Sequence, residues 1–178
     1  MSDPEKKQST PPPDRAARFV DFVLEKCRQD KGYAARLRRA DNPDTEYQSW
    51  ELLAGFGINL EKEDQRLPFA LTAAALARSK AAANGSLTLG RAIARCYEKG
   101  SESDQARARI RRLLACEDTA ELCRILRSLV TLVQSRIEEP LDYADLLRQL
   151  LRFPWNRQDV KARWARQFYA KSTAAEEP

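Results

Sequence analysis

The stretch Ala106-Arg107-Ala108-Arg109-Ile110-Arg111-Arg112-Leu113-Leu114 decides the fold class. Its large apolar residues, Ile110, Leu113 and Leu114, recur at the spacing of one helix face, and arginines lie on either side of that stripe. The same interleaving of arginine with leucine, isoleucine and alanine returns along the chain, which holds 31 lysines and arginines and no histidine. The pattern predicts a folded helical scaffold with permanent positive charge on its surface.

Apolar stripes of helical period extend in both directions from this stretch. Upstream, Phe19, Phe22 and Val23 follow the pattern, and downstream the longest stripe runs from Leu122 to Ile137. No alternating β pattern of useful length and no internal repeat is present. We therefore expect an all-α protein made of two small helical bundles, with about nine helices and short connections.

Clusters of small and polar residues divide the chain. The clearest break is Ala83-Asn84-Gly85-Ser86, where we place the boundary between an N-terminal helical bundle (15–83) and a C-terminal helical bundle (86–171). The proline-rich residues 1–14 and the last residues, 172–178, are expected to be disordered tails.

Prolines mark several expected helix ends. Residues 58–65 are expected to form a charged connector, after which Pro68 opens an alanine-rich helix over 69–82. Pro154 is expected to end the helix before it, and Asn156 to cap the last helix.

Composition argues against an enzyme. The chain lacks histidine, the side chain that titrates most naturally near neutral pH, and its carboxylates are spread singly. No phosphate-binding glycine loop is present. None of the four cysteines has C-x-x-C spacing, and each falls among apolar helical residues, so we expect free thiols, no metal and no cofactor. The cysteines are Cys27, Cys96, Cys116 and Cys123.

Targeting signals are also missing from the sequence. The first fourteen residues are polar and proline-rich, and no apolar stretch approaches the roughly 20 residues of a membrane span. We expect a cytoplasmic protein with no membrane partner.

The arginines are the positive signal for function. The net charge is +5, and pairs such as Arg91 with Arg95 and Arg148 with Arg152 share a helix face. The planar arginine fork suits phosphate, so such ridges can follow a nucleic-acid backbone. The alternative, which the pattern leaves open, is that acid–base pairs along the helices neutralise these charges. Trp155 follows Pro154 and can stack on bases if it is exposed, whereas Trp164 lies on an apolar stripe and is expected in the core.

The order of elements along residues 15–169 carries a resemblance to a known family. The matching elements are Leu37-Arg38-Arg39-Ala40, Arg66-Leu67-Pro68-Phe69-Ala70, Leu87-Thr88-Leu89-Gly90-Arg91-Ala92-Ile93-Ala94, Arg109-Ile110-Arg111-Arg112-Leu113-Leu114-Ala115, Leu122-Cys123-Arg124-Ile125-Leu126-Arg127-Ser128-Leu129, Leu141-Asp142-Tyr143, Leu146-Leu147-Arg148-Gln149-Leu150 and the Trp155, Trp164 and Phe168 end. This ordered set resembles the CasB small subunit of the type I-E Cascade, a CRISPR surveillance complex.

The resemblance implies an all-helical, non-catalytic subunit. It implies two copies in one complex, with backbone and large subunits, guide RNA and mainly single-stranded target DNA as partners. It further implies that basic side chains stabilise the R-loop by holding nucleic-acid backbones, notably the displaced non-target strand. The positions that correspond to the basic residues of the family are Arg38, Arg39, Arg66, Arg91, Arg109, Arg127 and Arg148.

Two other hypotheses remain open at this point. One is a free-standing arginine-rich helical nucleic-acid-binding protein, or a scaffold whose arginines meet acidic protein partners. The other is an enzyme with an unrecognised carboxylate site.

Overall fold

A computed structural model describes residues 14–171. In this range it contains eight α-helices and two short 3-10 helices, and no strand beyond an isolated bridge between Leu87 and Leu141. The prediction of an all-α protein is confirmed for this part of the chain. The elements in chain order are α1 (Arg15–Gln29), α2 (Lys31–Leu37), η1 (Glu46–Ser49), α3 (Trp50–Gly55), α4 (Glu63–Arg78), α5 (Leu89–Arg95), η2 (Gly100–Glu102), α6 (Asp104–Leu114), α7 (Thr119–Arg136) and α8 (Tyr143–Tyr169).

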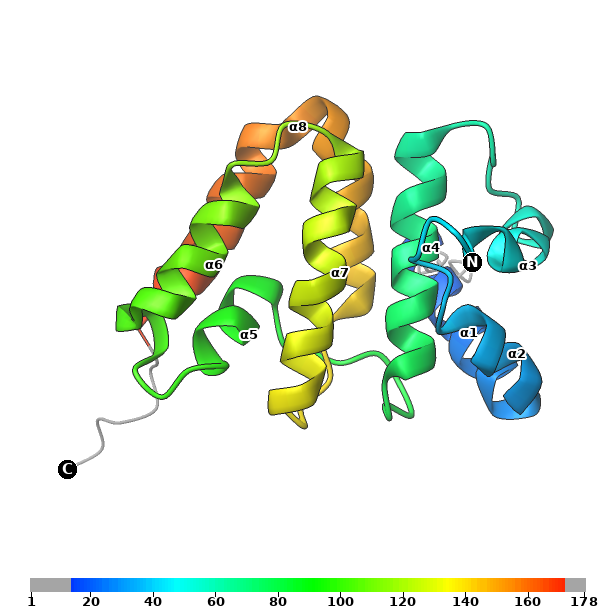
Figure 1. The fold of residues 1–178 in the computed structure, drawn as a ribbon, viewed down its shortest axis with the longest axis horizontal. Coiled ribbons are helices and arrows are strands. Elements are labelled where there is room, and N and C mark those ends of the chain that lie inside the picture. The colour runs from blue at the N-terminus through cyan, green and yellow to red at the C-terminus, as the bar shows by residue number, and fades with distance from the viewer. Residues whose placement is uncertain (1–13, 172–178) are drawn as a thin grey trace, which may run out of the picture.

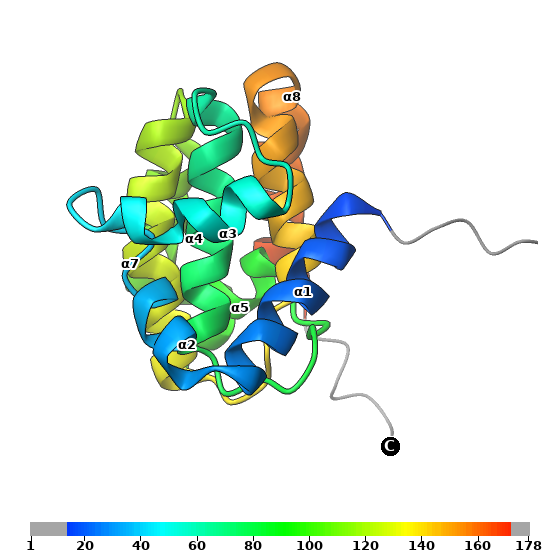
Figure 2. The same ribbon diagram turned by 90° about the vertical axis from the view of Figure 1, so that its right-hand side faces the viewer.

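The helices are arranged around α4 and α7, which lie side by side near the middle of the molecule (Figure 1). Helices α1, α2 and α3 cover one side of α4, as Figure 2 shows from the end. Helices α5 and α6 lie on the other side of α7, and α8 packs against α4 and α5. The predicted tails fall largely on residues 1–13 and 172–178, which lie outside the described range.

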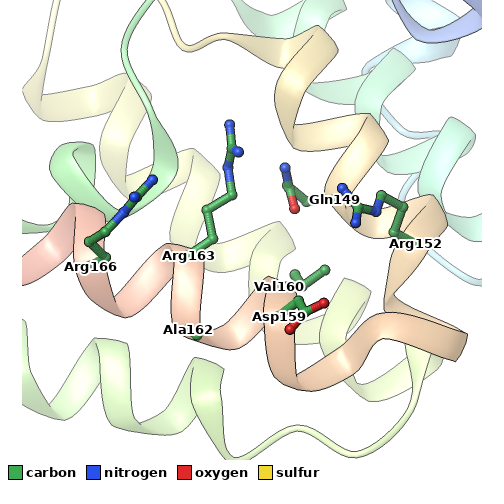
Figure 3. Close-up of a pocket in the computed structure, with 7 residues that line it drawn as sticks. All are labelled: Gln149, Arg152, Asp159, Val160, Ala162, Arg163 and Arg166. Atoms are coloured by element: carbon green, nitrogen blue, oxygen red, sulfur yellow. The ribbon is translucent and has the colours of Figure 1, made fainter.

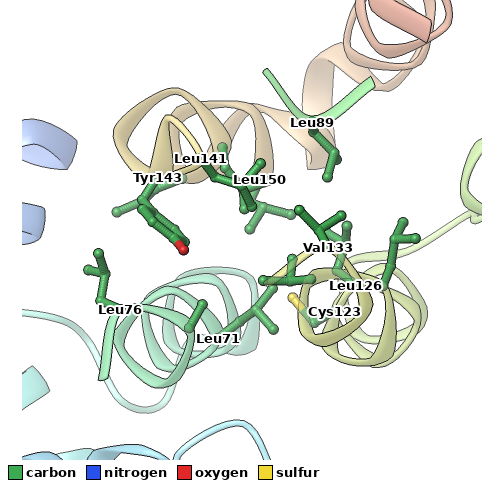
Figure 4. Packing of buried hydrophobic residues seen from close by; sticks show 14 of the residues in the cluster. Leu71, Leu76, Leu89, Cys123, Leu126, Val133, Leu141, Tyr143 and Leu150 are labelled. Atoms are coloured by element: carbon green, nitrogen blue, oxygen red, sulfur yellow. The ribbon is translucent and has the colours of Figure 1, made fainter. Parts of the chain in front are cut away.

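One hydrophobic core joins the two halves of the chain. Leu71 and Leu76 of α4 meet Leu126 and Val133 of α7, with Tyr143 of α8 beside them (Figure 4). The break at residues 83–86, where the sequence suggests a boundary between bundles, therefore lies in a connection across a shared core.

Helix α4 is buried around most of its circumference because its side chains are small. Ten of its sixteen residues are buried, from Pro68 to Ala77, and alanines among them let neighbouring helices approach closely. The expected bounds 69–82 were wrong, since the helix begins at Glu63 and ends at Arg78. Glu63 and Asp64 favour the earlier start because acidic side chains stabilise the positive end of the helix dipole.

Helix α8 consists of two helical arms joined at a kink. The backbone leaves helical geometry at Asn156, where φ is −124° and ψ is 39°. The expectation of two helices that meet near Pro154 and Asn156 is confirmed, except that the first arm includes Pro154 and continues to Trp155. The first arm (143–155) rises behind α7 and the second (157–169) descends behind α6 (Figure 1).

Helix α5 is held against the second arm of α8 by Gly90. A Cβ atom at this position would lie 2.3 Å from the backbone oxygen of Trp164 and 2.6 Å from Cβ of Gln167. The Gly90 N–H also donates a hydrogen bond to Oε1 of Gln167, at 3.2 Å. Only glycine permits this approach of two helices.

Candidate nucleic-acid interface

Two of the seven predicted arginines, Arg66 and Arg127, line a hollow of about 400 Å³ between α4 and α7, which we call the α4–α7 hollow. Arg66 donates from Nε to Oε1 of Glu46 at 2.7 Å and from Nη1 to the carbonyl of Leu60 at 2.7 Å. Because Glu46 is buried, this pair fixes η1 on α4 and engages most of the Arg66 guanidinium.

Asp41 organises the other side of the α4–α7 hollow. Arg78 holds its carboxylate with two hydrogen bonds, from Nη2 at 2.7 Å and from Nη1 at 3.1 Å. Arg127 Nε lies 3.6 Å from the same carboxylate, whose side chain is only 3% exposed. Arg38 donates from Nε to the carbonyl of Ala77 at 3.2 Å. Arg38 and Arg127 are therefore partly engaged in joining the chain after α2 to α4 and α7.

Three other predicted arginines, one in the turn after α2 and one each on α5 and α6, are less engaged. Arg39 and Arg109 are exposed and Arg91 is partly exposed. Within residues 14–171 none of the three makes an ion pair or a side-chain hydrogen bond. On α6, Arg109 and Arg112 are one turn apart and both point away from the core.

Arg148 belongs to a separate group on α8. The two arms of α8 enclose a hollow of about 360 Å³, which we call the α8 hollow. Arg152 and Gln149 line it from the first arm, and Arg163 and Arg166 line it from the second arm (Figure 3). Arg148 lies one turn before Arg152 on the first arm.

Carboxylates reach only part of this group. Asp145 accepts from Nη2 of Arg163 at 3.0 Å and lies 3.6 Å from Nη1 of Arg148. Arg148 Nε also donates to Asp14 at 2.9 Å. The Ala17 N–H has the largest effect on the pKa of Asp14 and lowers it; burial opposes this, and Arg148 lowers the pKa further, so that it lies below its ordinary value. Arg152 and Arg166 have no ion-pair partner among residues 14–171.

The second arm of α8 was not predicted to join this group. Asp159, Arg163 and Arg166 follow the same i, i+4, i+7 spacing that marks one helix face. That signal was present, but the expectation of separate helices around Pro154 gave no reason to place the two faces together.

The thiols show no sign of activation for chemistry. All four cysteines are free, and three of them are buried. Burial raises the pKa of Cys116 to about 11 and raises the pKa of Cys123 further. A thiol that stays protonated at neutral pH is a poor nucleophile and a poor metal ligand. Among the described residues, no group of three or more metal-ligating side chains is close enough together to hold an ion.

None of the helices from residue 14 to residue 171 is long and apolar enough to cross a membrane.

Several solved structures share this fold. The chain is 26% identical to CasB of M. ruber with a TM-score of 0.67, covering 88% of this chain and 93% of that one. It is 27% identical to CasB of Thermus thermophilus with a TM-score of 0.65, covering 86% and 97%. A chain of a CRISPR RNA-guided surveillance complex, 19% identical, shares the fold with a TM-score of 0.67 over 87% and 91%.

A search of curated proteins gave no match. The family model for the CRISPR-associated protein Cse2 matches residues 33–169, which span most of the chain. This match and the structural similarity to CasB confirm the resemblance seen in the sequence. The chain belongs to the CRISPR-associated protein Cse2 family.

Proposed function

We propose that this protein is a non-catalytic, nucleic-acid-binding small subunit of a CRISPR RNA-guided surveillance complex. In this role it stabilises the R-loop by holding DNA and RNA backbones, notably the displaced non-target strand. Its partners would be backbone and large subunits, a second copy of itself, guide RNA and target DNA. Family membership supports the assembly.

One observation carries the nucleic-acid part of the proposal. Exposed arginines without an ion-pair partner in residues 14–171 are spread over α6, α7 and α8, so carboxylates do not neutralise the helical surface. Such arginines are free to contact phosphates, and the counterions they release favour binding. R-loop formation exchanges strands of nearly equal stability, so modest backbone contacts are enough to favour the open state. The arginines concerned include Arg109, Arg111, Arg112, Arg124, Arg152 and Arg166.

The seven predicted arginines should contribute unequally. We expect Arg39, Arg91 and Arg109 to contribute most, because the described structure leaves their guanidinium groups without a carboxylate. Arg38, Arg127 and Arg148 would contribute less, since each already contacts protein oxygens. Arg66 would contribute least, because Glu46 and Leu60 hold it.

Affinity purification of the tagged protein, expressed with the genes that neighbour its own, tests the assembly. We expect a ribonucleoprotein with several different subunits and two copies of this chain, measured by native mass spectrometry. Recovery of the chain alone, tightly bound to single strands, would favour a free-standing binder. Recovery with proteins but no RNA would favour a scaffold.

R-loop lifetime in the purified complex tests the role of the arginines. Replacing Arg109 with alanine should shorten the lifetime, whereas the same change at Arg28, which pairs with Glu25 on α1, serves as the matched control. Equal lifetimes for both variants and the unaltered complex would contradict the proposal.

A further inference from the structure

An exposed tryptophan completes the stripe of arginines on the first arm of α8. Arg148, Arg152 and Trp155 lie at i, i+4 and i+7, so they share the helix face that points away from the core. The Trp155 side chain is 72% exposed, whereas Trp164 on the second arm is 1% exposed and packs against Phe153. Exposure of so large an apolar ring has a cost in water, and no packing within the described chain compensates for it.

The bend at Asn156 brings a second stripe to the same place. Asp159, Arg163 and Arg166 of the second arm line the α8 hollow together with Arg152 (Figure 3). In that view the three arginine side chains extend into one open space, and Gln149 lies between them. An anion in the α8 hollow would thus meet Arg152 from the first arm and Arg166 from the second. Asp145 already accepts a hydrogen bond from Arg163, and the Asp159 carboxylate also lines the hollow.

Charges around Trp155 decide on which side of the ring an anion can lie. On one side is Arg152, one turn away on the same arm and without an ion-pair partner in the described residues. On the other side, Trp155 borders a hollow lined by three carboxylates, Glu63, Asp64 and Asp118, and by two basic side chains, Arg15 and Lys62. Because the acids outnumber the bases there, the Arg152 side is the more favourable one for a nucleic-acid backbone.

We propose that Arg152 and Arg166 hold phosphates of a single nucleic-acid strand while Trp155 stacks on one of its bases. We call these three residues the α8 clamp. The inference rests on the proposed function and adds one requirement to it, which is an unpaired base. Bases within a duplex are stacked on one another and cannot reach Trp155, so the α8 clamp selects single strands, without preference for a base sequence.

Tryptophan fluorescence of the full-length protein tests the α8 clamp directly. Trp50 is 40% exposed, so the measurement uses a Trp50→Phe background in which Trp155 is the exposed tryptophan of the described chain. Titration with an oligothymidylate should quench the emission, because the base stacks on the indole. An abasic strand of equal length carries the same phosphates and should bind without this quenching.

Affinity measured by fluorescence anisotropy gives the second readout. Trp155→Ala should weaken oligothymidylate binding about tenfold, which corresponds to about 1.4 kcal/mol, and should leave abasic-strand binding unchanged. Trp155→Phe should retain most of the affinity because it keeps an aromatic face. Trp50→Ala, on α3, is the matched control and should have no effect. Since Trp155 is 72% exposed and Trp50 is 40% exposed, circular dichroism should show all three variants folded.

The outcomes separate this inference from the proposed function. If Trp155→Ala binds oligothymidylate as the unaltered protein does and the strand causes no quenching, the α8 clamp is refuted, and Trp155 instead suits a protein contact. If the unaltered protein binds neither strand at low salt, the proposed nucleic-acid role itself is contradicted.

Discussion

Replacing Asp41 with asparagine should weaken the fold and strengthen nucleic-acid binding at once. The Asp41 side chain is 3% exposed, and it neutralises Arg78 through two hydrogen bonds and Arg127 at 3.6 Å. Asparagine keeps the size of the side chain but turns an N–H group toward the guanidinium groups. Arg78 would then stay in a largely buried position with no charge opposite it, whereas Arg127 could turn toward solvent.

The expected loss of stability follows from the burial of these partners. Breaking a fully buried ion pair costs about 3–5 kcal/mol. Here the Arg78 and Arg127 side chains are 22% and 44% exposed, so water screens part of the unpaired charge. We therefore expect a loss of about 2–3 kcal/mol in the free energy of unfolding, by discounting that range for screening. For a chain of this length it lowers Tm by about 4–12 °C.

Asp44→Asn is the matched control for this experiment. It changes the net charge equally, lies in the same segment, and removes an exposed carboxylate that has no ion pair within residues 14–171. Thermal unfolding followed by circular dichroism measures stability, and anisotropy of a labelled single strand over a range of salt measures binding. Asp41→Asn should also steepen the dependence of affinity on salt by about 0.7 for the phosphate that Arg127 gains. Equal melting of the two variants, or equal salt slopes, would refute this account of Asp41.

Two further substitutions and one labelling experiment have equally definite outcomes. Gly90→Ala should lower Tm of the chain by several degrees, because its Cβ would overlap the backbone of α8; unchanged melting would show that α5 can shift. Arg109→Ala should alter stability by about 0.5 kcal/mol or less and reduce the salt slope of single-strand binding by about 0.7; early melting would instead assign Arg109 to the fold. Cys116 should resist maleimide at pH 7 while half-buried Cys27 reacts faster, because burial holds the Cys116 pKa near 11 and the thiolate is the reactive form; equal labelling of both in the folded protein would contradict this.

The sequence predicted the elements well wherever local signals were sufficient. The apolar stripe of α7 appears as expected, and Asp118 and Asp142 cap α7 and α8; each of these features depends on residues three or four positions apart. Trp164 lies in the core for the same reason. The Pro68 expectation failed because a proline removes only one backbone donor, and burial of the surrounding helix outweighs that loss. The break expected near Pro154 appears as the kink at Asn156.

The arrangement of the arginines could not be predicted from the sequence in the same way. Arg66 and Arg109 look alike in sequence, each on a helix rich in apolar residues. Whether a guanidinium is held or free depends on carboxylates such as Glu46 and Asp41, which lie 20 or more positions away along the chain. The resemblance identifies positions where the family has basic residues. Packing determines how many of these arginines in this chain lack a carboxylate or carbonyl partner.

The uneven engagement of the arginines changes how the charge of this molecule should be regarded. At physiological ionic strength the electrostatic screening length is about 8 Å, so a strand responds to nearby groups and hardly to the formal total of +5. The surface where Asp41 pairs with Arg78 is nearly neutral toward such a strand, whereas Arg152 and Arg166 create a strong positive local potential. Exchanging an acid and a base between these two regions leaves the isoelectric point unchanged. Such an exchange should nevertheless change where a polyanion binds on the surface.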